Sequence, residues 1–273
     1  GVQTCALPIS KTFTSLLIGT LVDAGKLSFN DSIYKHLPSG VFPQKYINGT
    51  LVDITVGQAL SHMAGLHASN ITDFYNLTFP VNSTESLKKF RNEPLYFEPG
   101  TDWSYSNYGF QILGAIIEKI TGKSYQDAMD SFIHNTLRLS SGTMIERPTT
   151  LLHHHPRPRY YRSNNFTENI PVGPFDEAAL SSGALAAGGI ISTIDDLLAY
   201  GNHLIDAYHQ RPHAIIKNET LAQIWTKRSS NAPSFPLRPG NEYGYGWMIA
   251  HIPEDLNPNL QYRDFNWHSG RMS

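Results

Sequence analysis

The residues with the clearest chemical potential lie mid-chain, in the tripeptide Tyr105-Ser106-Asn107. After Asn107, apolar side chains recur at spacings of three and four, the period of one buried helical face: Phe110, Leu113, Ile117 and Ile120. Gly122 suits the end of that helix. A phenol and a carboxamide on the turn that enters a rigid helix can be held in fixed relation to a cleft. The alternative is a tyrosine packed under a loop and an asparagine that serves as the helix N-cap.

Two further polar signals flank this turn in the sequence. Lys11 lies near the start of a predicted helix over residues 11–24, which has Phe13, Leu16, Leu17 and Leu21 on one face and Gly25 after its end. His268-Ser269-Gly270 follows a segment that begins at Phe265 and favours a strand. The functional interpretation below depends on these three signals and on their order.

The elements that must position these residues are mostly helices, followed by strands. A further helix is predicted over residues 56–63, with Asp53 or Thr55 as the cap, and another over residues 84–92. Two more are predicted, one that begins after Ser124 and one from 192 to 206. Strands are predicted over residues 243–249 and from 265 onwards, and residues 67–84 are predicted to form a surface insertion. Helices first and strands last indicate an α+β fold.

A metal site is a weaker interpretation. His153-His154-His155 could bind a metal, but three adjacent residues in an irregular, proline-flanked segment need not converge on one ion. We interpret them as a solvated loop. No HExxH motif occurs in the sequence, so a metallo-hydrolase is a poor third reading, and we expect neither a metal nor a cofactor.

Taken together, the ordered signals resemble the serine β-lactamase and penicillin-binding-protein superfamily, with its Ser-x-x-Lys and Lys-Thr-Gly elements. The chain is most similar to class C β-lactamases and DD-peptidases, in which Tyr-x-Asn is the middle element, and to the mitochondrial serine β-lactamase-like proteins of animals. Further matches are residues 60–66 (LSHMAGL), Pro99-Gly100, Ala187-Gly188-Gly189 with Ser192, Thr193 and Asp196, and Tyr245-Gly246-Trp247. The resemblance covers about residues 10–270. It implies a β-lactamase/transpeptidase-like fold, in which helices flank an antiparallel sheet beside a helical lobe.

The resemblance also implies roles for individual residues. Lys11 would take a proton from a serine three residues earlier, one helical turn away. Tyr105 would relay protons to the leaving group. Asn107 would contact a substrate amide. His268 would supply a cation or a hydrogen-bond donor, and with Ser269 and Gly270 it would lie beside a strand edge that can pair with an extended acyl substrate.

The sequence departs from the family at the nucleophile, because position 8 is Pro8. Residues 2–9 (VQTCALPI) are the in-frame translation of a common sequencing-adapter oligonucleotide, so we interpret residues 1–9 as foreign and residues 10–273 as a partial domain, truncated at both ends. Ser10 is no substitute, since adjacent helical residues point about 100° apart. We therefore expect a fragment of a serine hydrolase for peptide-like amide or ester substrates, inactive as written. The alternative is a non-catalytic scaffold or binding protein with the same fold.

Composition restricts the partners and the compartment. A formal net charge of −2 and the absence of long Lys/Arg runs argue against nucleic acid, and no apolar run approaches the roughly 18 residues of a membrane span. Composition predicts roughly three N-x-[ST] triplets, whereas seven occur, at Asn30, Asn48, Asn70, Asn76, Asn82, Asn165 and Asn218. This excess favours a secreted or lumenal protein, whereas the family resemblance favours mitochondria. The lone Cys5 excludes a disulfide framework, and the oligomeric state is left open.

Overall fold

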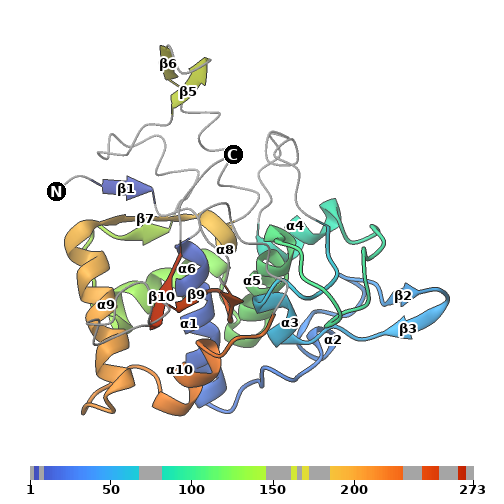
Figure 1. The fold of residues 1–273 in the computed structure, drawn as a ribbon, viewed down its shortest axis with the longest axis horizontal. Helices are drawn as coiled ribbons and strands as arrows, with labels where there is room; N and C mark the ends of the chain where they lie inside the picture. Colours follow the sequence, from blue (N-terminus) through green and yellow to red (C-terminus); the bar gives the residue numbers. More distant parts are fainter. Residues whose placement is uncertain are drawn as a thin grey trace.

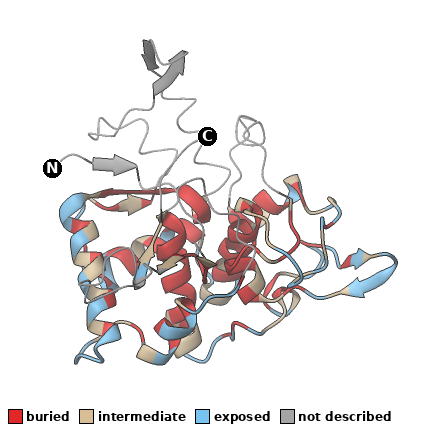
Figure 2. Ribbon diagram, in the orientation of Figure 1, coloured by how far each residue is buried: buried red, intermediate tan, exposed pale blue. Residues whose placement is uncertain are grey.

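The structure is a computed structural model that describes residues 3–5, 9–67, 82–145, 161–164, 168–171, 185–229, 242–251 and 264–268. Two helices form its centre, α1 (Ser10–Asp23) and α5 (Asn107–Thr121), and both are largely buried (Figures 1 and 2). The other α-helices are α2 (Ile33–His36), α3 (Val56–Leu60), α4 (Ser83–Ser86), α6 (Tyr125–Ser131), α8 (Leu185–Gly188), α9 (Ile194–Tyr208) and α10 (Asn218–Ile224). A 3-10 turn (Leu87–Lys89) follows α4, and a π-helical turn (Phe132–Thr136) follows α6.

The strands pair antiparallel in small sheets. One three-stranded sheet has the order β10 (Asp264–Trp267), β9 (Met248–His251), β8 (Glu242–Tyr243), and another has the order β1 (Gln3–Cys5), β7 (Ile190–Thr193), β4 (Met144–Ile145). Two hairpins, β2–β3 (Lys45–Ile47 and Thr50–Val52) and β5–β6 (Tyr161–Asn164 and Glu168–Pro171), complete the described strands. Helices packed with antiparallel sheets confirm the predicted α+β class.

Helix α1 is buried on almost all sides, beyond the single apolar face that its sequence predicted. It packs against α5, α8 and α10, so its polar side chains also lie inside the protein. These groups bind the backbone of neighbouring elements: Thr14 Oγ1 donates to Ala186 O at 2.6 Å, and Ser15 Oγ donates to Tyr245 O at 2.6 Å. Buried hydroxyls satisfied in this way fix the position of α1 relative to α8 and to the β8–β9 turn.

Helix α5 joins the helical elements through one carboxylate. Glu118 accepts hydrogen bonds from Ser83 N at 2.8 Å and from Thr84 N at 3.0 Å, at the start of α4. It also accepts from Tyr125 N at 3.1 Å, at the start of α6. Amides at a helix start have no partner within the helix, so a carboxylate placed between two helix starts stabilises both.

Most predicted helix caps are found in the structure. Thr55 caps α3 in a capping box with Gln58, Ser124 caps α6, and Thr193 caps α9. Helix α3, however, ends at Leu60 and does not reach the predicted residue 63. His62 takes the left-handed conformation with φ of 62°, which breaks the helix there.

The predicted strand over residues 243–249 is wrong, because this segment is a hairpin. Tyr243 pairs with Met248, and Gly244 N donates to Trp247 O at 2.8 Å across the turn. Gly246 has φ of 76°, and a Cβ there would lie 3.1 Å from Lys11 O. Only glycine permits both this conformation and such a close approach to α1.

Two helical glycines give a matched test of this packing. A Cβ on Gly109 of α5 would lie 2.7 Å from Ala59 O, whereas a Cβ on Gly201 of α9 would meet no atom of the described residues within 4 Å. We expect Gly109→Ala to lower the free energy of unfolding by about 1–3 kcal/mol through overpacking. Gly201→Ala should raise it by about 0.5–1 kcal/mol, since alanine suits a helix interior better than glycine. Denaturant unfolding of both variants measures this, and a change of the same sign in both would contradict the close contact of α3 with α5.

Candidate functional site

The candidate site is built around the amine of Lys11, in the first turn of α1. The side chain is buried, with 2% of the residue exposed. Its Nζ donates to Asn107 Oδ1 at 2.7 Å and to Ala187 O at 3.1 Å. The same nitrogen lies 4.9 Å from the centre of the Tyr105 ring. Helices α1, α5 and α8 therefore meet at one amine.

Burial changes the chemistry of this amine. Desolvation penalises the ammonium form and lowers the pKa of Lys11 from 10.5 to about 7. Both oxygens that receive its hydrogen bonds belong to uncharged amides. At neutral pH this lysine can consequently exist in the uncharged form that accepts a proton.

The turn before α5 is held by Ser106. Its Oγ accepts from Tyr108 N at 3.2 Å and donates to His67 O at 2.5 Å, so Ser106 is the N-cap of α5. The alternative interpretation of Asn107 as the N-cap is wrong. Asn107 is instead the first residue of α5, and its carboxamide meets Lys11. Burial raises the pKa of Tyr105 above its ordinary value, which keeps the phenol protonated.

His268 lies at the end of β10, close to the same residues. Its ring centre is 6.5 Å from that of Tyr105, and its Nε2 lies 2.9 Å from Tyr243 Oη. The structure thus gathers Lys11, Tyr105, Asn107 and His268, four residues from distant parts of the chain, into one region. Pro8, Ser269 and Gly270 lie outside the described residues.

Two residues that the sequence did not single out individually lie between these elements, His62 and Tyr243. His62 is 2% exposed and its ring centre is 4.2 Å from that of Tyr105. Burial, and then the charges of Lys11 and His268, hold its pKa well below the ordinary range, so His62 is neutral. Its family-like motif, residues 60–66, was visible in the sequence. The left-handed backbone that turns the ring inward was not.

The side chain of Ser10 is hydrogen-bonded to β7 and does not take the place of the missing nucleophile beside Lys11. Its Oγ accepts from Ile190 N at 3.0 Å, and the residue is completely buried against β7. This contact agrees with the argument that adjacent helical side chains point in different directions.

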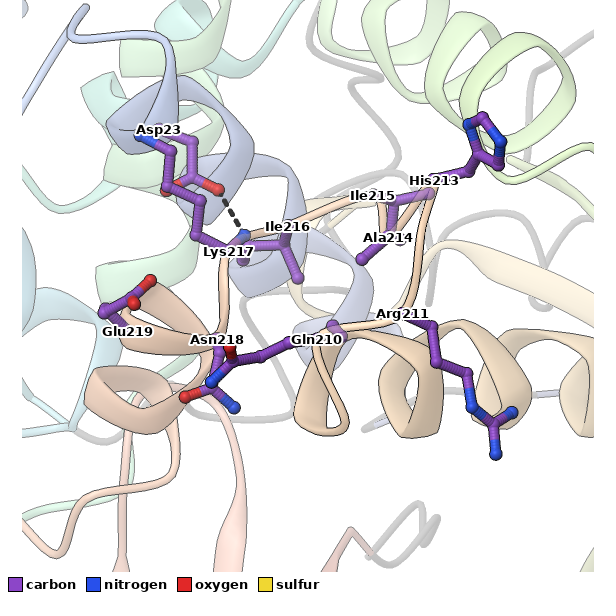
Figure 3. Close-up of a pocket in the computed structure, with 11 residues that line it drawn as sticks. Asp23, Gln210, Arg211, His213, Ala214, Ile215, Ile216, Lys217, Asn218 and Glu219 are labelled. Atoms are coloured by element: carbon purple, nitrogen blue, oxygen red, sulfur yellow. Dashed lines mark hydrogen bonds between the residues drawn. The ribbon is translucent and has the colours of Figure 1, made fainter.

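A separate cavity of about 380 Å³ lies at the other end of α1 (Figure 3). Its lining includes Asp23, whose carboxylate accepts from Lys217 N at 2.7 Å and from Thr220 Oγ1 and so stabilises the start of α10. Asp23 is twelve residues after Lys11, roughly 18 Å along a helix. This cavity is therefore distinct from the candidate site.

Four of the sequon asparagines are described. Asn30 and Asn48 are exposed. Asn82 Oδ1 accepts from Glu85 N at 2.8 Å as the cap of α4, and Asn218 Nδ2 donates to Tyr208 O at 2.7 Å. Asn70, Asn76 and Asn165 lie outside the described residues, as do His153, His154 and His155. Among the residues that are described, no cluster of three His, Cys, Asp or Glu side chains could hold a metal, and no helix could cross a membrane.

Comparison with known proteins gives relatives across nearly the whole chain. The human protein "Serine beta-lactamase-like protein LACTB, mitochondrial" is 22% identical over an alignment of length 335, gaps included, that covers 96% of this chain. The chain spans 59% of the length of that relative.

Solved structures agree on the fold. The octameric penicillin-binding protein homologue from Pyrococcus abyssi superposes with a TM-score of 0.71 at 23% identity, over 91% of this chain and 53% of its own. A D-stereospecific amidohydrolase from Streptomyces superposes with a TM-score of 0.69 at 24% identity, over 92% of this chain and 72% of its own. The predicted β-lactamase/transpeptidase-like fold is therefore confirmed. The sequence profile described as Beta-lactamase matches residues 9–273, and the chain belongs to the Beta-lactamase family.

Proposed function

We propose that the parent protein of this chain is a serine hydrolase that cleaves peptide-like amide or ester bonds through an acyl-enzyme. The observation that carries the proposal is the desolvated amine of Lys11, held by Asn107 and Ala187 beside the ring of Tyr105. A buried lysine whose pKa is lowered to about 7, next to a phenol, can act as a general base with a proton relay beside it.

The proposed reaction assigns one step to each group. Neutral Lys11 takes the proton of a serine hydroxyl at position 8 while the serine oxygen attacks the acyl carbonyl carbon. The Tyr105 hydroxyl gives a proton to the departing nitrogen or oxygen and regains one from the Lys11 ammonium, which leaves an acyl-serine. Water then attacks the ester carbonyl carbon and gives one proton to neutral Lys11, and the Lys11 ammonium returns that proton to the serine oxygen, which leaves as a hydroxyl and releases the acid. Asn107 contacts the substrate amide, and His268, Ser269 and Gly270 bind the acyl chain.

The names of the relatives support this reaction class. A penicillin-binding protein homologue and a D-stereospecific amidohydrolase share the fold, and the second name states amide hydrolysis for that protein. The identity of the substrate depends on the loops that line the pocket, and no sequence motif describes those loops.

In the chain as written, position 8 is a proline, which has no nucleophilic side-chain atom. This residue favours a second candidate function, a non-catalytic scaffold or binding protein. We attribute Pro8 instead to foreign residues 1–9. The intact coding sequence tests that attribution, because a serine codon at position 8 would support the hydrolase and any other codon would support the scaffold.

Labelling with an active-site probe tests the proposed nucleophile. We expect no covalent adduct of a fluorophosphonate with the chain as written and a stoichiometric adduct with the Pro8→Ser variant in which the native ends are restored. In that background Lys11→Ala and Tyr105→Phe should each slow acylation on the order of a hundredfold, the scale of acid–base catalysis. Mass spectrometry of the labelled peptide is the readout. Labelling of Ser10 in the chain as written, or undiminished acylation in both variants, would remove these assignments.

The pH dependence of the Pro8→Ser variant tests the role of Lys11. Only the uncharged amine accepts a proton, and the pKa of Lys11 is lowered to about 7, so kcat/KM should rise with pH through a midpoint near 7. Hydrolysis of a nitrophenyl ester between pH 5.5 and 9 measures the profile. His268→Ala serves as the control and should keep the midpoint. A profile that is flat through neutrality would exclude Lys11 as the base.

Glycosylation tests the compartment. The sequons support residence in the secretory pathway, whereas the mitochondrial relative supports the alternative. For secretory residence we expect glycans first at the exposed Asn30 and Asn48, so glycosidase treatment of the native protein should lower its apparent mass and Asn48→Gln should remove part of that shift. Co-fractionation with mitochondria and no shift would establish the alternative.

A further inference from the structure

We propose that His62 and Tyr243 are positioning residues that fix the tautomer and orientation of His268 through a hydrogen-bonded chain starting at the Tyr105–Asn107 turn. The significance of this chain for catalysis rests on the proposed function. Its existence can be tested without any activity.

The first link of the chain sets its direction. Ser106 N lies 3.2 Å from His62 Nδ1, and a backbone N–H can only donate. His62 Nδ1 must then be the unprotonated nitrogen. Burial keeps the ring neutral, so its single proton lies on Nε2.

The next two links follow from the first. His62 Nε2 lies 3.1 Å from Tyr243 Oη and, since it carries the proton, it donates to that oxygen. The phenol has one proton of its own to donate, and His268 Nε2 lies 2.9 Å from the same oxygen. Burial raises the pKa of Tyr243 and keeps the phenol protonated. When His268 is neutral, its Nε2 therefore accepts and its own proton lies on Nδ1.

The backbone around His62 is built to hold this arrangement. His62 has φ of 62°, an uncommon conformation for a residue with a side chain. Its carbonyl accepts from Ser104 N at 3.0 Å, and two residues earlier Leu60 O accepts from Gly246 N at 3.0 Å. The segment thus binds both the turn before α5 and the turn between β8 and β9. Strain of this kind persists where the surrounding contacts determine the conformation, as they do at functional sites.

A fixed tautomer matters at His268 because the two ring nitrogens have opposite roles in a neutral imidazole. Because Nε2 accepts from Tyr243, Nδ1–H is the donor atom of a neutral His268. Because the hydrogen-bonded chain begins at Ser106 N, it connects His268 to the turn that carries Tyr105 and Asn107. We therefore assign His62 and Tyr243 to positioning, without contact with the reacting atoms.

Histidine ¹⁵N chemical shifts measure the tautomers directly in the chain as written. At a pH where His268 is neutral, we expect His62 as the Nε2–H form and His268 as the Nδ1–H form, with His268 assigned by the loss of its signals in His268→Gln. Tyr243→Phe should shift His268 towards Nε2–H and leave His62 as Nε2–H, since Ser106 still donates to its Nδ1. Tyr245→Phe removes a hydroxyl two residues away, from a ring that packs against Phe29 and Arg228, and should change neither histidine.

An Nε2–H form of His268 in the unsubstituted chain, or an unchanged tautomer in Tyr243→Phe, would overturn the proposal. In the Pro8→Ser background, loss of one neutral hydrogen bond in Tyr243→Phe should raise KM roughly fivefold to tenfold with a smaller effect on kcat. If the Pro8→Ser variant has no activity while the ¹⁵N shifts follow the expectation, the proposed function fails and the positioning chain stands.

Discussion

The burial of one amine is the constraint on which the rest of the site depends. A lysine nitrogen inside a protein is costly unless its hydrogen bonds are made, and Lys11 makes them with Asn107 on α5 and Ala187 on α8. These three residues are far apart in the sequence, so the amine is satisfied only when α1, α5 and α8 have reached their final positions. The burial that lowers the pKa of Lys11 and the hydrogen bonds that join the three helices thus meet at one nitrogen atom.

Close backbone approach provides the other half of this arrangement. Gly246 lies against the backbone of Lys11, and Gly109 lies against the carbonyl of Ala59. Both glycines allow elements that carry site residues to approach more closely than side chains would permit. The distances around Lys11 consequently depend on positions that have no side chain at all.

The local parts of the fold could be predicted from the sequence, while the features that join them could not. The apolar spacing after Asn107 predicted α5, and the polar residues Ser124 and Thr193 predicted caps, because helix period and capping are properties of neighbouring residues. The turn within residues 243–249 was missed, since alternating aromatic and glycine residues suit a strand and a hairpin equally well. The direction of the hydrogen bonds that His62 makes was missed for a different reason. It depends on one left-handed backbone angle and on partners 44 and 181 residues away in the sequence.

The complete burial of α1 also bears on how this protein folds. The amine of Lys11 and the hydroxyls of Thr14 and Ser15 bind partners that lie 96 to 230 residues further along the chain. During synthesis this helix leaves the ribosome before these partners, and its polar groups must wait for them. Contacts of such long sequence separation are formed slowly, and segments that wait for them are exposed to incorrect association in the meantime. The element that the candidate site is built around therefore has an environment that is complete only after segments far along the chain have been synthesised.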